Sequence, residues 1–444
     1  MITKSVALIL DNKNRDLDGI CLLAKNLVDM GCCVNIVPYN LMQFELYLID
    51  FDFVLFSFIR PYNYALVKEI TDAGVPVGIL DSEGGVFSDI KIMFNTWPKN
   101  ISRINNLYYF FWGASLYRHA LDNNLLGKNN AFLTGCPRFD VYADFGSRYP
   151  SKSLEHKDYI LVNTNYPLAN PEFNSVANEL KQAMCFDTAD QRISTLHKRQ
   201  IEERAAIIDL VDFLSSRVSK KIIIRPHPFE SASYYKERFK HNSSVLVIKG
   251  GTVKSVIQNA SLIIQRGCST GFESRLLGKR SLSPDWVPFK SETLVDQGNT
   301  FFTSREELLT YVNDFNSEAS VEIDNATRSH IEKYFYKIDG NASHRVASKI
   351  LDLMKKDENL LQFGKFKIKC LAKKFIFECF GFTNLSFLRV YFSEIRKWVH
   401  SEKFFAVDDI ANTCHELGFD LKVDQVGSDK FKKHSRCSIQ VRGI

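Results

Sequence analysis

A run of small polar residues between two apolar segments carries the clearest chemical signal in the chain. Leu262 to Ile264 predicts a short buried strand, and the turn Arg266-Gly-Cys-Ser-Thr-Gly271 follows it. A helix from Glu273 to Leu277 is expected next. Backbone N–H groups, hydroxyls and the positive helix end would then point to one place, which is the chemistry of a phosphate site. Plain N-capping by Ser269 or Thr270 is the alternative.

Two further turns have the composition of anion-binding loops. The segment Lys221-Ile-Ile-Ile-Arg-Pro-His-Pro228 predicts a buried strand that leaves the sheet in an extended geometry. His227 is therefore held between two prolines beside Arg225, and we expect it to contact a phosphate or pyrophosphate, although a lone His is usually structural. Gly250 and Gly251 form a similar turn before another predicted helix. Glu273 is placed in a first helical turn, where it could accept ribose hydroxyls.

Acidic residues follow two other predicted strands. Asp81 and Glu83 come directly after the segment Val75 to Leu80, in the turn that Gly84 and Gly85 complete. Either acid could be the base that deprotonates a hydroxyl, and either could instead hold the turn or cap a helix. Glu83 is favoured because it directly precedes the glycines. Asp16 and Asp18 are weaker candidates, since both could be first-turn acids of the next helix.

The elements that must position these residues alternate between strands and helices. In the first part of the chain we expect strands over 5–10, 34–37, 53–58 and 75–80, with helices over 16–30 and 63–73. This alternation predicts a parallel, doubly wound sheet, which binds its ligands at the carboxyl ends of its strands. Arg138 follows another strand, where it could hold an anion or pair with Asp140. Asn163 and Asn165 lie in a further turn of this kind.

The same pattern restarts after a polar segment over 147–157, so the chain is predicted to contain two such domains. An acceptor-binding Rossmann-like domain is expected over 1–150 and a donor-binding one over 151–350, facing each other across a crevice. A helical, basic extension is expected over 351–444.

Composition narrows the class of protein. The 444 residues are 45% hydrophobic and 13% aromatic, which suits a packed globular protein. Apolar runs fall short of the roughly 18 to 20 residues of a membrane span, and Val6 to Leu10 is too short for the apolar core of a signal peptide. The ten Cys show neither a Cys-x-x-Cys pair nor zinc spacing. We therefore expect a cytoplasmic protein with no metal site and no cofactor.

The segment over 361–404 differs from the rest of the chain. It contains nine basic and three acidic residues, and its charge of +6 equals that of the whole chain. Aromatic and aliphatic residues are interleaved with the basic ones. A basic amphipathic helix of this kind could bind the anionic inner face of the plasma membrane. The alternative is a helical cap on the second domain with a solvated basic face. A nucleic-acid partner is not expected, because the basic residues are confined to one segment.

Taken together, the motifs resemble a family of bacterial surface-carbohydrate biosynthesis proteins, similar in layout to the Kdo transferases of capsule assembly and to GT-B sialyltransferases. The resemblance covers about residues 1 to 300. The segments that carry it are Lys13-Asn-Arg-Asp-Leu-Asp18, Leu80-Asp-Ser-Glu-Gly84, Phe111-Trp-Gly113, Thr134-Gly-Cys-Pro-Arg-Phe-Asp140, Asn163-Thr-Asn165, Arg225-Pro-His-Pro228 and Gly267-Cys-Ser-Thr-Gly-Phe-Glu273.

The resemblance implies roles for three of these turns. The His-Pro turn and the Ser-Thr turn would each contact a phosphate of the donor, and an acidic-acidic-Gly turn would carry the base. The chain departs from that pattern, because Ser82 stands where a second acid is expected. Metal-free GT-B enzymes stabilise the leaving phosphate with cationic groups or helix ends. Asp16-Leu-Asp18 has the spacing of a metal-binding Asp-x-Asp motif, but it precedes a helix of the acceptor domain.

The predicted function is a glycosyltransferase of O-antigen (lipopolysaccharide) or capsule biosynthesis. Its expected partners are a nucleotide-sugar donor and a glycan or lipid-linked acceptor. Two alternatives keep the fold and change the reaction, namely polyol-phosphate transfer and sugar-nucleotide epimerisation. A third is a non-catalytic subunit that binds nucleotide-sugars, which the altered turn around Ser82 would favour.

Overall fold

The chain contains two compact units, each with its own sheet and its own core. The computed structural model describes residues 4–84, 90–149, 155–184, 190–289, 296–315, 325–356, 365–380, 403–426 and 439–443. The N-terminal unit comprises Met1–Gly85, Ile90–Pro150 and Ile331–Ile444. The central unit comprises Val86–Asp89 and Ser151–His330.

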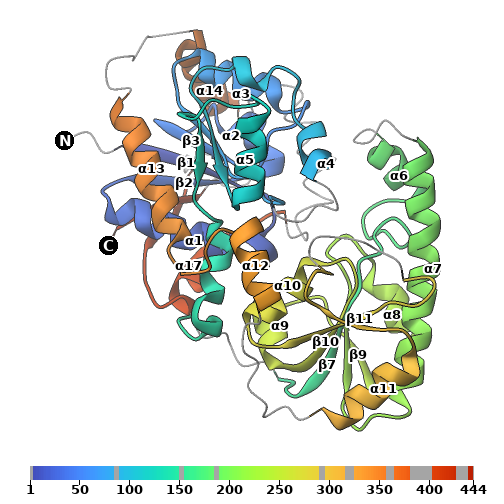
Figure 1. Ribbon diagram of the computed structural model, residues 1–444. Helices are drawn as coiled ribbons and strands as arrows, with labels where there is room; N and C mark the ends of the chain where they lie inside the picture. The colour runs from blue at the N-terminus through green and yellow to red at the C-terminus, as the bar shows by residue number, and fades with distance from the viewer. Residues whose placement is uncertain are drawn as a thin grey trace. The chain divides into compact units, whose positions relative to one another are not determined.

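A mixed sheet forms the centre of the N-terminal unit. Its strand order among the described residues is β13-β14-β2-β1-β3-β4-β5-β6 (Figure 1). Neighbouring strands from β1 to β6 are parallel, as the alternating sequence pattern predicts. The strands are β1 (Ser5–Leu10), β2 (Cys33–Pro38), β3 (Phe53–Phe56), β4 (Val77–Ile79), β5 (Leu107–Phe111), β6 (Ala131–Leu133), β13 (Lys422–Gln425) and β14 (Ile439–Arg442).

Helix α1 is the helix that positions the candidate residues of this unit. Asn12 caps it by accepting a hydrogen bond from the Arg15 backbone N–H at 3.2 Å. A Cβ atom at Gly19 would lie only 2.5 Å from the Arg138 backbone nitrogen, so Gly19 allows segment η3 to approach α1 closely. The helices and turns are α1 (Lys13–Asp29), η1 (Tyr39–Leu41), α2 (Met42–Glu45), α3 (Tyr64–Asp72), α4 (Ile90–Asn95), η2 (Ile101–Arg103), α5 (Ala114–Asp122), η3 (Pro137–Gly146), α13 (Ala342–Lys356), α14 (Lys365–Phe380) and α17 (Val407–Glu416).

The C-terminal segment returns to the N-terminal unit, which corrects two predicted boundaries. Helices α13 and α17 both pack against α1, and β14 pairs antiparallel with β2, placing Ile439 opposite Ile36 (Figure 1). The structure divides the chain at Pro150 and Ser151, but residues 331–350 do not belong to the second domain. Nor is 351–444 only a helical extension, because the hairpin of β13 and β14 extends the first sheet. Sequence periodicity does not predict the return of the C-terminal segment, because β14 pairs with a strand that is far away in the chain.

A parallel sheet also forms the centre of the central unit. Its strand order among the described residues is β12-β11-β10-β7-β8-β9. Helices α7, α8 and α11 pack their apolar residues on one face of it, and Figure 1 shows α9 and α10 on the other side from α7. The elements are β7 (Tyr159–Asn163), α6 (Val176–Met184), α7 (Asp190–Ser215), β8 (Ile222–Arg225), α8 (Ala232–Arg238), β9 (Val245–Val247), α9 (Val253–Asn259), β10 (Ala260–Ile264), α10 (Ser269–Leu276), β11 (Arg280–Pro284), β12 (Thr300–Phe302), α11 (Arg305–Asp314) and α12 (Asn325–Tyr334).

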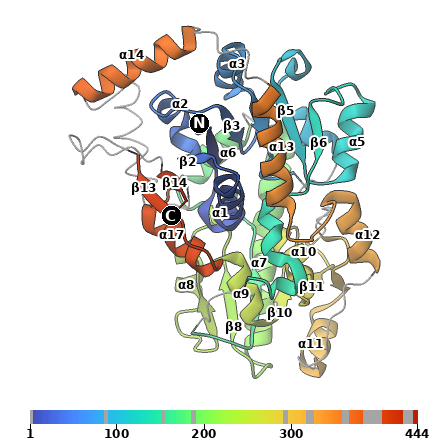
Figure 2. The same cartoon turned by 90° about the vertical axis from the view of Figure 1, so that its left-hand side faces the viewer.

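Helix α14 carries most of the described part of the basic segment, and it packs on the N-terminal unit (Figure 2). Lys369 pairs with Glu69 at 2.5 Å and Lys374 with Asp50 at 2.6 Å. The predicted alternative of a cap on the second domain is therefore wrong, because the acids that attract these lysines belong to the first. Residues 361–364 and 381–402 of the predicted basic segment lie outside the described residues.

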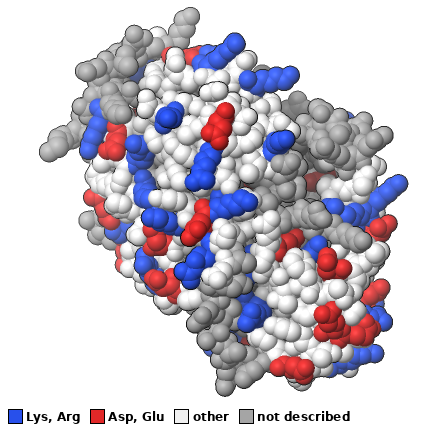
Figure 3. Space-filling model, in the orientation of Figure 1, with Lys and Arg blue, Asp and Glu red and all other residues white. Residues whose placement is uncertain are grey.

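Charged side chains are interspersed on the surface. On the face drawn in Figure 3, Lys and Arg side chains lie among Asp and Glu side chains on both units. Among the described residues, no helix combines the length and the apolar character needed to cross a membrane.

Candidate functional site

Each sheet has a point where its strand order reverses. In the N-terminal unit β1 lies between β2 and β3, and in the central unit β7 lies between β8 and β10. The loops that leave two such neighbouring strands separate to opposite faces, which opens a ligand crevice at the carboxyl edge of the sheet. The residues predicted to do chemistry lie at the last positions of strands, in the loops at these two edges, or on helices that begin there.

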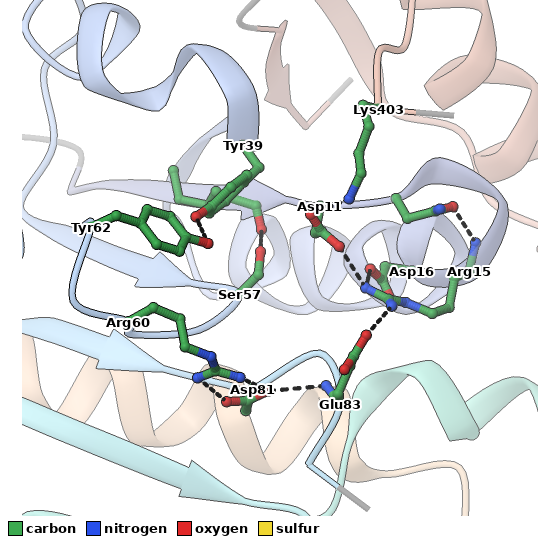
Figure 4. Close-up of polar contacts among 12 residues, drawn as sticks. Asp11, Arg15, Asp16, Tyr39, Ser57, Arg60, Tyr62, Asp81, Glu83 and Lys403 are labelled. Carbon is green, nitrogen blue, oxygen red and sulfur yellow. Dashed lines mark hydrogen bonds and ion pairs between the residues drawn. The ribbon is translucent and has the colours of Figure 1, made fainter. Parts of the chain in front are cut away.

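The edge of the N-terminal unit carries a cluster of ion pairs around Arg15 (Figure 4). The guanidinium lies 2.8 Å from Asp16 and 2.8 Å from Asp11, and 3.4 Å from Glu83. Burial alone would lower the pKa of Arg15, but the Asp16 carboxylate raises it well above its ordinary value. Lys403, from the C-terminal segment, donates to Asp11 at 2.6 Å. Burial would raise the pKa of Asp11, but Lys403 and Arg15 lower it.

Asp81 and Glu83 have different surroundings in the same turn. The Asp81 carboxylate accepts hydrogen bonds from Arg60 at 2.9 Å, the Tyr109 hydroxyl at 3.1 Å and the Glu83 backbone N–H at 3.1 Å. Its side chain is 1% exposed, whereas that of Glu83 is 58% exposed. Asp81 thus holds the turn together, and Glu83 is the acid that solvent and substrate can reach.

A pocket opens between α1 and the ends of β1, β3 and β4. Asp16 and Arg138 lie at this pocket with Asp81, whereas Asp18, half-buried on α1, does not line it. The Asp140 carboxylate accepts hydrogen bonds from the backbone N–H groups of Ala342 and Ser343, at the start of α13. The lining residues are Ile9, Asp16, Gly19, Ile20, Leu55, Phe56, Ser57, Leu80, Asp81, Ser82, Cys136, Pro137 and Arg138.

An aromatic group completes this edge and was missed by the sequence analysis. Tyr39 follows β2, and Phe58 and Tyr62 follow β3. The Tyr39 ring lies 4.6 Å from that of Phe58 and 6.3 Å from that of Tyr62, and the two tyrosine hydroxyls are hydrogen-bonded (Figure 4). Tyr62 is exposed. The available signal was that aromatic residues lie in the segments after β2 and β3, the strands on either side of β1.

In the central unit, a buried acid holds the His-Pro turn in place. Glu230 accepts hydrogen bonds from the Thr164 hydroxyl at 2.6 Å, the Tyr166 backbone N–H at 3.2 Å and the His227 backbone N–H at 3.4 Å. It therefore joins the loops after β7 and β8. The Nδ1 atom of His227 accepts from the Phe229 backbone N–H at 3.2 Å, which leaves the proton of a neutral imidazole on Nε2. Sequence analysis overlooked Glu230.

The remaining loops of this edge are also tied to one another. Arg225 donates to the Gly251 carbonyl at 3.1 Å, so it supports the double-glycine turn, whose Gly250 is exposed. Asn165 donates to the Gly267 carbonyl at 3.1 Å. Asn163 ends β7 at the switch point and is only 5% exposed, yet both polar atoms of its amide have no partner among the described residues. An amide buried in this way can form its hydrogen bonds with a bound ligand.

Helix α10 begins earlier than predicted, which changes the position of Glu273. The helix starts at Ser269 and not at Glu273, so Glu273 lies in the second turn. It is fully buried, and Ser269 donates its hydroxyl to the carboxylate at 3.0 Å. Thr270 lies in the first turn. The prediction failed because the small residues before Glu273 are themselves helical. In this geometry Glu273 holds the first turn.

Two acids near the same turn were not singled out from the sequence. Asp296 accepts hydrogen bonds from the Gly267 backbone N–H at 3.0 and 3.1 Å. Glu203, on α7, is buried, and burial raises its pKa to about 7 although Arg199 and Arg266 lower it. Neither acid belongs to a motif, so their position depends on tertiary packing. Among the described residues, no group of three or more His, Cys, Asp or Glu is arranged to hold a metal ion.

Comparisons with known proteins report on the fold. No family model and no curated protein sequence matches the chain. A solved structure of a variant of the wall teichoic acid polymerase TagF with CDPG is similar, with a TM-score of 0.51 and 12% sequence identity. The match covers 80% of this chain and 89% of TagF. UDP-GlcNAc 2-epimerase from Methanocaldococcus jannaschii matches with a TM-score of 0.48, 15% identity, and coverage of 79% and 99%.

The likeness to TagF shows that the chain has a GT-B fold, with two Rossmann-like domains. This confirms the predicted fold class. At 12% identity the likeness establishes the fold and nothing finer. The assignment of residues to substrates stays a prediction, as does the crevice between the domains.

Proposed function

We propose that the chain is a metal-independent glycosyltransferase of surface-polysaccharide biosynthesis, with a nucleotide-sugar donor and a glycan or lipid-linked acceptor. The observation that carries the proposal is that each Rossmann-like unit has polar groups available to a ligand at the carboxyl edge of its sheet. In the central unit this is the buried, unpartnered amide of Asn163 beside the His227 turn. In the N-terminal unit it is the exposed carboxylate of Glu83 beside the pocket.

The donor would bind the central unit. Its diphosphate would lie at the first turn of α10, at the backbone N–H groups of Ser269 and Thr270 and the positive helix end, with the His227 Nε2–H as a further donor. These groups stabilise the charge that develops on the leaving diphosphate. The amide of Asn163, buried at the switch point, would complete its hydrogen bonds with the same ligand.

The acceptor would bind the N-terminal unit, with Glu83 as the general base. The acceptor hydroxyl oxygen attacks the anomeric carbon, the bond from that carbon to the diphosphate oxygen breaks, and the hydroxyl proton passes to Glu83. Arg15 lies 3.4 Å from Glu83 and keeps its carboxylate oriented. The aromatic group of Tyr39, Phe58 and Tyr62 offers a surface on which a sugar ring can stack.

A binding screen followed by product analysis tests the proposal. Thermal shifts with CMP, CDP, UDP and GDP identify the base, and mass spectrometry of reactions with the matching sugar nucleotides detects transfer. We expect one diphosphate to stabilise the wild type and a glycosylated product to form only when acceptor is present. A product formed from the sugar nucleotide alone would identify an epimerase. Nucleotide binding without any product would favour the non-catalytic subunit.

Polyol-phosphate transfer is the second candidate, because the structural neighbour TagF is a teichoic acid polymerase studied with CDPG. In that reaction the donor is cleaved at its phosphorus, so the product gains a polyol phosphate and CMP is released. A product that contains a polyol phosphate, formed from a CDP-polyol with release of CMP, would show that this reaction takes the place of sugar transfer.

We also propose that α14 brings the protein to an anionic membrane surface. Its lysines on the inner side pair with acids of the N-terminal unit, whereas Ile368, Leu371 and Phe375 point outward and are 62%, 56% and 66% exposed. These three lie at i, i+3 and i+7, so they form one apolar stripe on the helix. Insertion of such a stripe at the headgroup boundary, with basic residues nearby, is the behaviour of interfacial helices.

Sedimentation with vesicles of phosphatidylglycerol and phosphatidylcholine tests this placement. Changing Ile368, Leu371 and Phe375 together to Ser should remove most binding. The matched control changes Ile201, Tyr234 and Val287, which are exposed on the central unit, and should bind like the wild type. Equal loss in both variants, or none in either, would contradict the role of α14.

A further inference from the structure

The pocket of the N-terminal unit contains one buried hydroxyl without a partner. Ser82 is 8% exposed, and its Oγ atom has no hydrogen-bond partner among the residues that the structure describes. Its backbone N–H donates to the Ser57 carbonyl at 2.7 Å, so the residue is fixed at the end of β4. A buried hydroxyl that forms no hydrogen bond costs about 1–3 kcal/mol, so it points to a group that arrives with the ligand.

The other polar side chains of the pocket are already engaged. Ser57 donates its hydroxyl to the Ile9 carbonyl at 2.8 Å. Asp81 is held by Arg60 and Tyr109, and Asp16 is held by Arg15. Arg138 also lines the pocket, with its guanidinium over the Phe139 ring. Ser82 is thus a lining residue whose hydroxyl remains available to a ligand.

Most of the pocket wall is apolar. Ile9 and Leu55 come from the strands, Ile20 from α1, and Leu80 and Pro137 from the loops. The pocket has an empty volume of about 420 Å³ including its open mouth. A hydroxylated ring face buried against such a wall would leave its hydroxyls unsatisfied. A group that combines an apolar end with one acceptor oxygen satisfies both the wall and Ser82.

From this geometry we infer that the pocket binds the acetamido group of an N-acetylated acceptor sugar, with Ser82 donating to its carbonyl oxygen. The methyl end packs against the apolar wall. A deoxy-sugar methyl would leave the Ser82 hydroxyl unpaired. A carboxylate would add a negative charge to a pocket whose lining already sets two acids, Asp16 and Asp81, against one cation, Arg138. Ser82 is then a residue that determines specificity. The inference rests on the proposed function, because it assigns this edge to the acceptor.

Binding of an acetamido group also explains why Ser82 stands where the resembled family has a second acid. An acid there would be a third carboxylate at the pocket, beside Asp16 and Asp81. Its charge would need a partner in a largely apolar place, whereas a neutral hydroxyl needs only one acceptor. A neutral serine at position 82 can therefore bind a neutral substituent of the sugar. The exposed carboxylate of Glu83 remains outside the pocket.

Saturation-transfer NMR with the full chain tests the inference without requiring turnover. The probes are the methyl glycosides of N-acetylglucosamine and N-acetylgalactosamine, each paired with the glycoside of glucose or galactose. We expect the acetyl methyl protons to receive the strongest saturation, and the N-acetylated sugar of each pair to bind at least about tenfold more tightly, from one hydrogen bond and one buried methyl group.

Two variants separate the hydroxyl from the shape of the pocket. Ser82→Ala should reduce the preference for the N-acetylated sugar by about 3- to 10-fold, the value of one neutral hydrogen bond. Ser57→Ala removes a hydroxyl from the same pocket that is already bonded to Ile9, and it should change the preference less.

Three outcomes would overturn the inference. They are equal binding of both sugars in a pair, an unchanged preference in Ser82→Ala, and absence of saturation transfer from the wild type to any of the four sugars. The nucleotide screen is independent of these results, because the donor binds the central unit. A protein that binds a diphosphate and transfers a sugar, yet shows no preference for N-acetylated glycosides, would lose this inference and keep the proposed function.

Discussion

The carboxyl edge of the N-terminal sheet is crowded with ion pairs, whereas the edge of the central sheet is made mainly from backbone turns and neutral side chains. Arg15 alone contacts three carboxylates at the first edge. At the second edge, Asn163, His227 and the first turn of α10 offer amide, imidazole and hydroxyl groups. The charged residues there include Arg225, Glu230, Glu273 and Asp296, and they bond to loops or to the first turn of α10 and fix their positions.

This difference matches what each edge would have to do. A diphosphate carries its own negative charge, so a helix end and neutral donors are sufficient to hold it. A base must stay ionised near an acceptor hydroxyl, so its edge needs compensating cations. At the N-terminal edge these come from distant segments, since Arg60 follows β3 and Lys403 comes from the C-terminal segment. The groups offered to a ligand at the central edge thus come from local motifs, whereas the ion pairs of the N-terminal edge depend on tertiary contacts.

A substitution of Glu83 should separate the roles of the two edges most clearly, because it should change turnover and leave nucleotide affinity unchanged. Glu83→Gln should lower turnover by about 10² to 10⁴-fold, because a general base contributes roughly that factor. Nucleotide affinity should stay close to that of the wild type. Rates under donor saturation, combined with calorimetry of the nucleotide, measure both quantities.

The neighbouring acid serves as the contrasting variant. Asp81→Asn should act mainly on stability, lowering the free energy of unfolding by about 1–3 kcal/mol, because Arg60 and Tyr109 lose a charged acceptor. Full turnover in Glu83→Gln would move the base to another residue, with Asp16 next to test.

Removal of Lys403 tests whether the acceptor edge depends on the C-terminal segment. Lys403→Met should lower the free energy of unfolding by about 1–3 kcal/mol, since Asp11 loses a charged donor at 2.6 Å. The pKa of Asp11 is lowered in the folded state, so the pair stabilises the protein above pH 3.8. That contribution is lost as the pH falls through the folded pKa. Lys422→Met, on exposed β13, is the control and should have little effect in urea denaturation.

At the donor edge, His227→Ala should weaken diphosphate binding by about tenfold, equivalent to one hydrogen bond to a charged group. The melting temperature without ligand should change little, because the turn is held by the backbone contact to Glu230. His241→Ala, an exposed histidine of the same unit, should bind nucleotide like the wild type. Unchanged affinity in the His227 variant would remove this side chain from the site.

The buried acid of α7 predicts a smaller, pH-dependent effect. The pKa of Glu203 is about 7 in the folded protein and 4.5 in its ordinary state, so the folded chain binds more protons between these values. The free energy of unfolding should therefore fall as the pH rises from 4.5 to about 7. Glu203→Gln should flatten this slope in melts at pH 5, 6, 7 and 8. An identical slope in both proteins would refute the assignment.

The smallest expected effect is that of metal removal. If donors at the central edge stabilise the leaving diphosphate, activity should be unchanged after dialysis against excess EDTA. A loss of activity that Mg²⁺ or Mn²⁺ restores would show that a metal ion, and not the groups of the central edge alone, stabilises the leaving diphosphate.

Much of the donor edge could be predicted because its signals are local. The prolines around His227, the two glycines before α9 and the small residues before α10 lie next to strands with clear apolar runs. The error at Glu273 is also local, because small polar residues can either precede a helix or form its first turn. Glu230 and Asp296 were missed because their partners lie in other loops.

The sequence by itself determined the alternation of strands and helices, hence the parallel sheets, and the turns at the strand ends, because periodicity and turn composition act over a few residues. Only the tertiary structure decided that the chain returns after residue 330 to complete the first unit. It also decided that Asp81 is enclosed while Glu83 is exposed, and that the hydroxyl of Ser82 faces a pocket. Burial and ion pairing depend on segments hundreds of residues apart, such as Asp11 and Lys403, and no local pattern encodes that proximity.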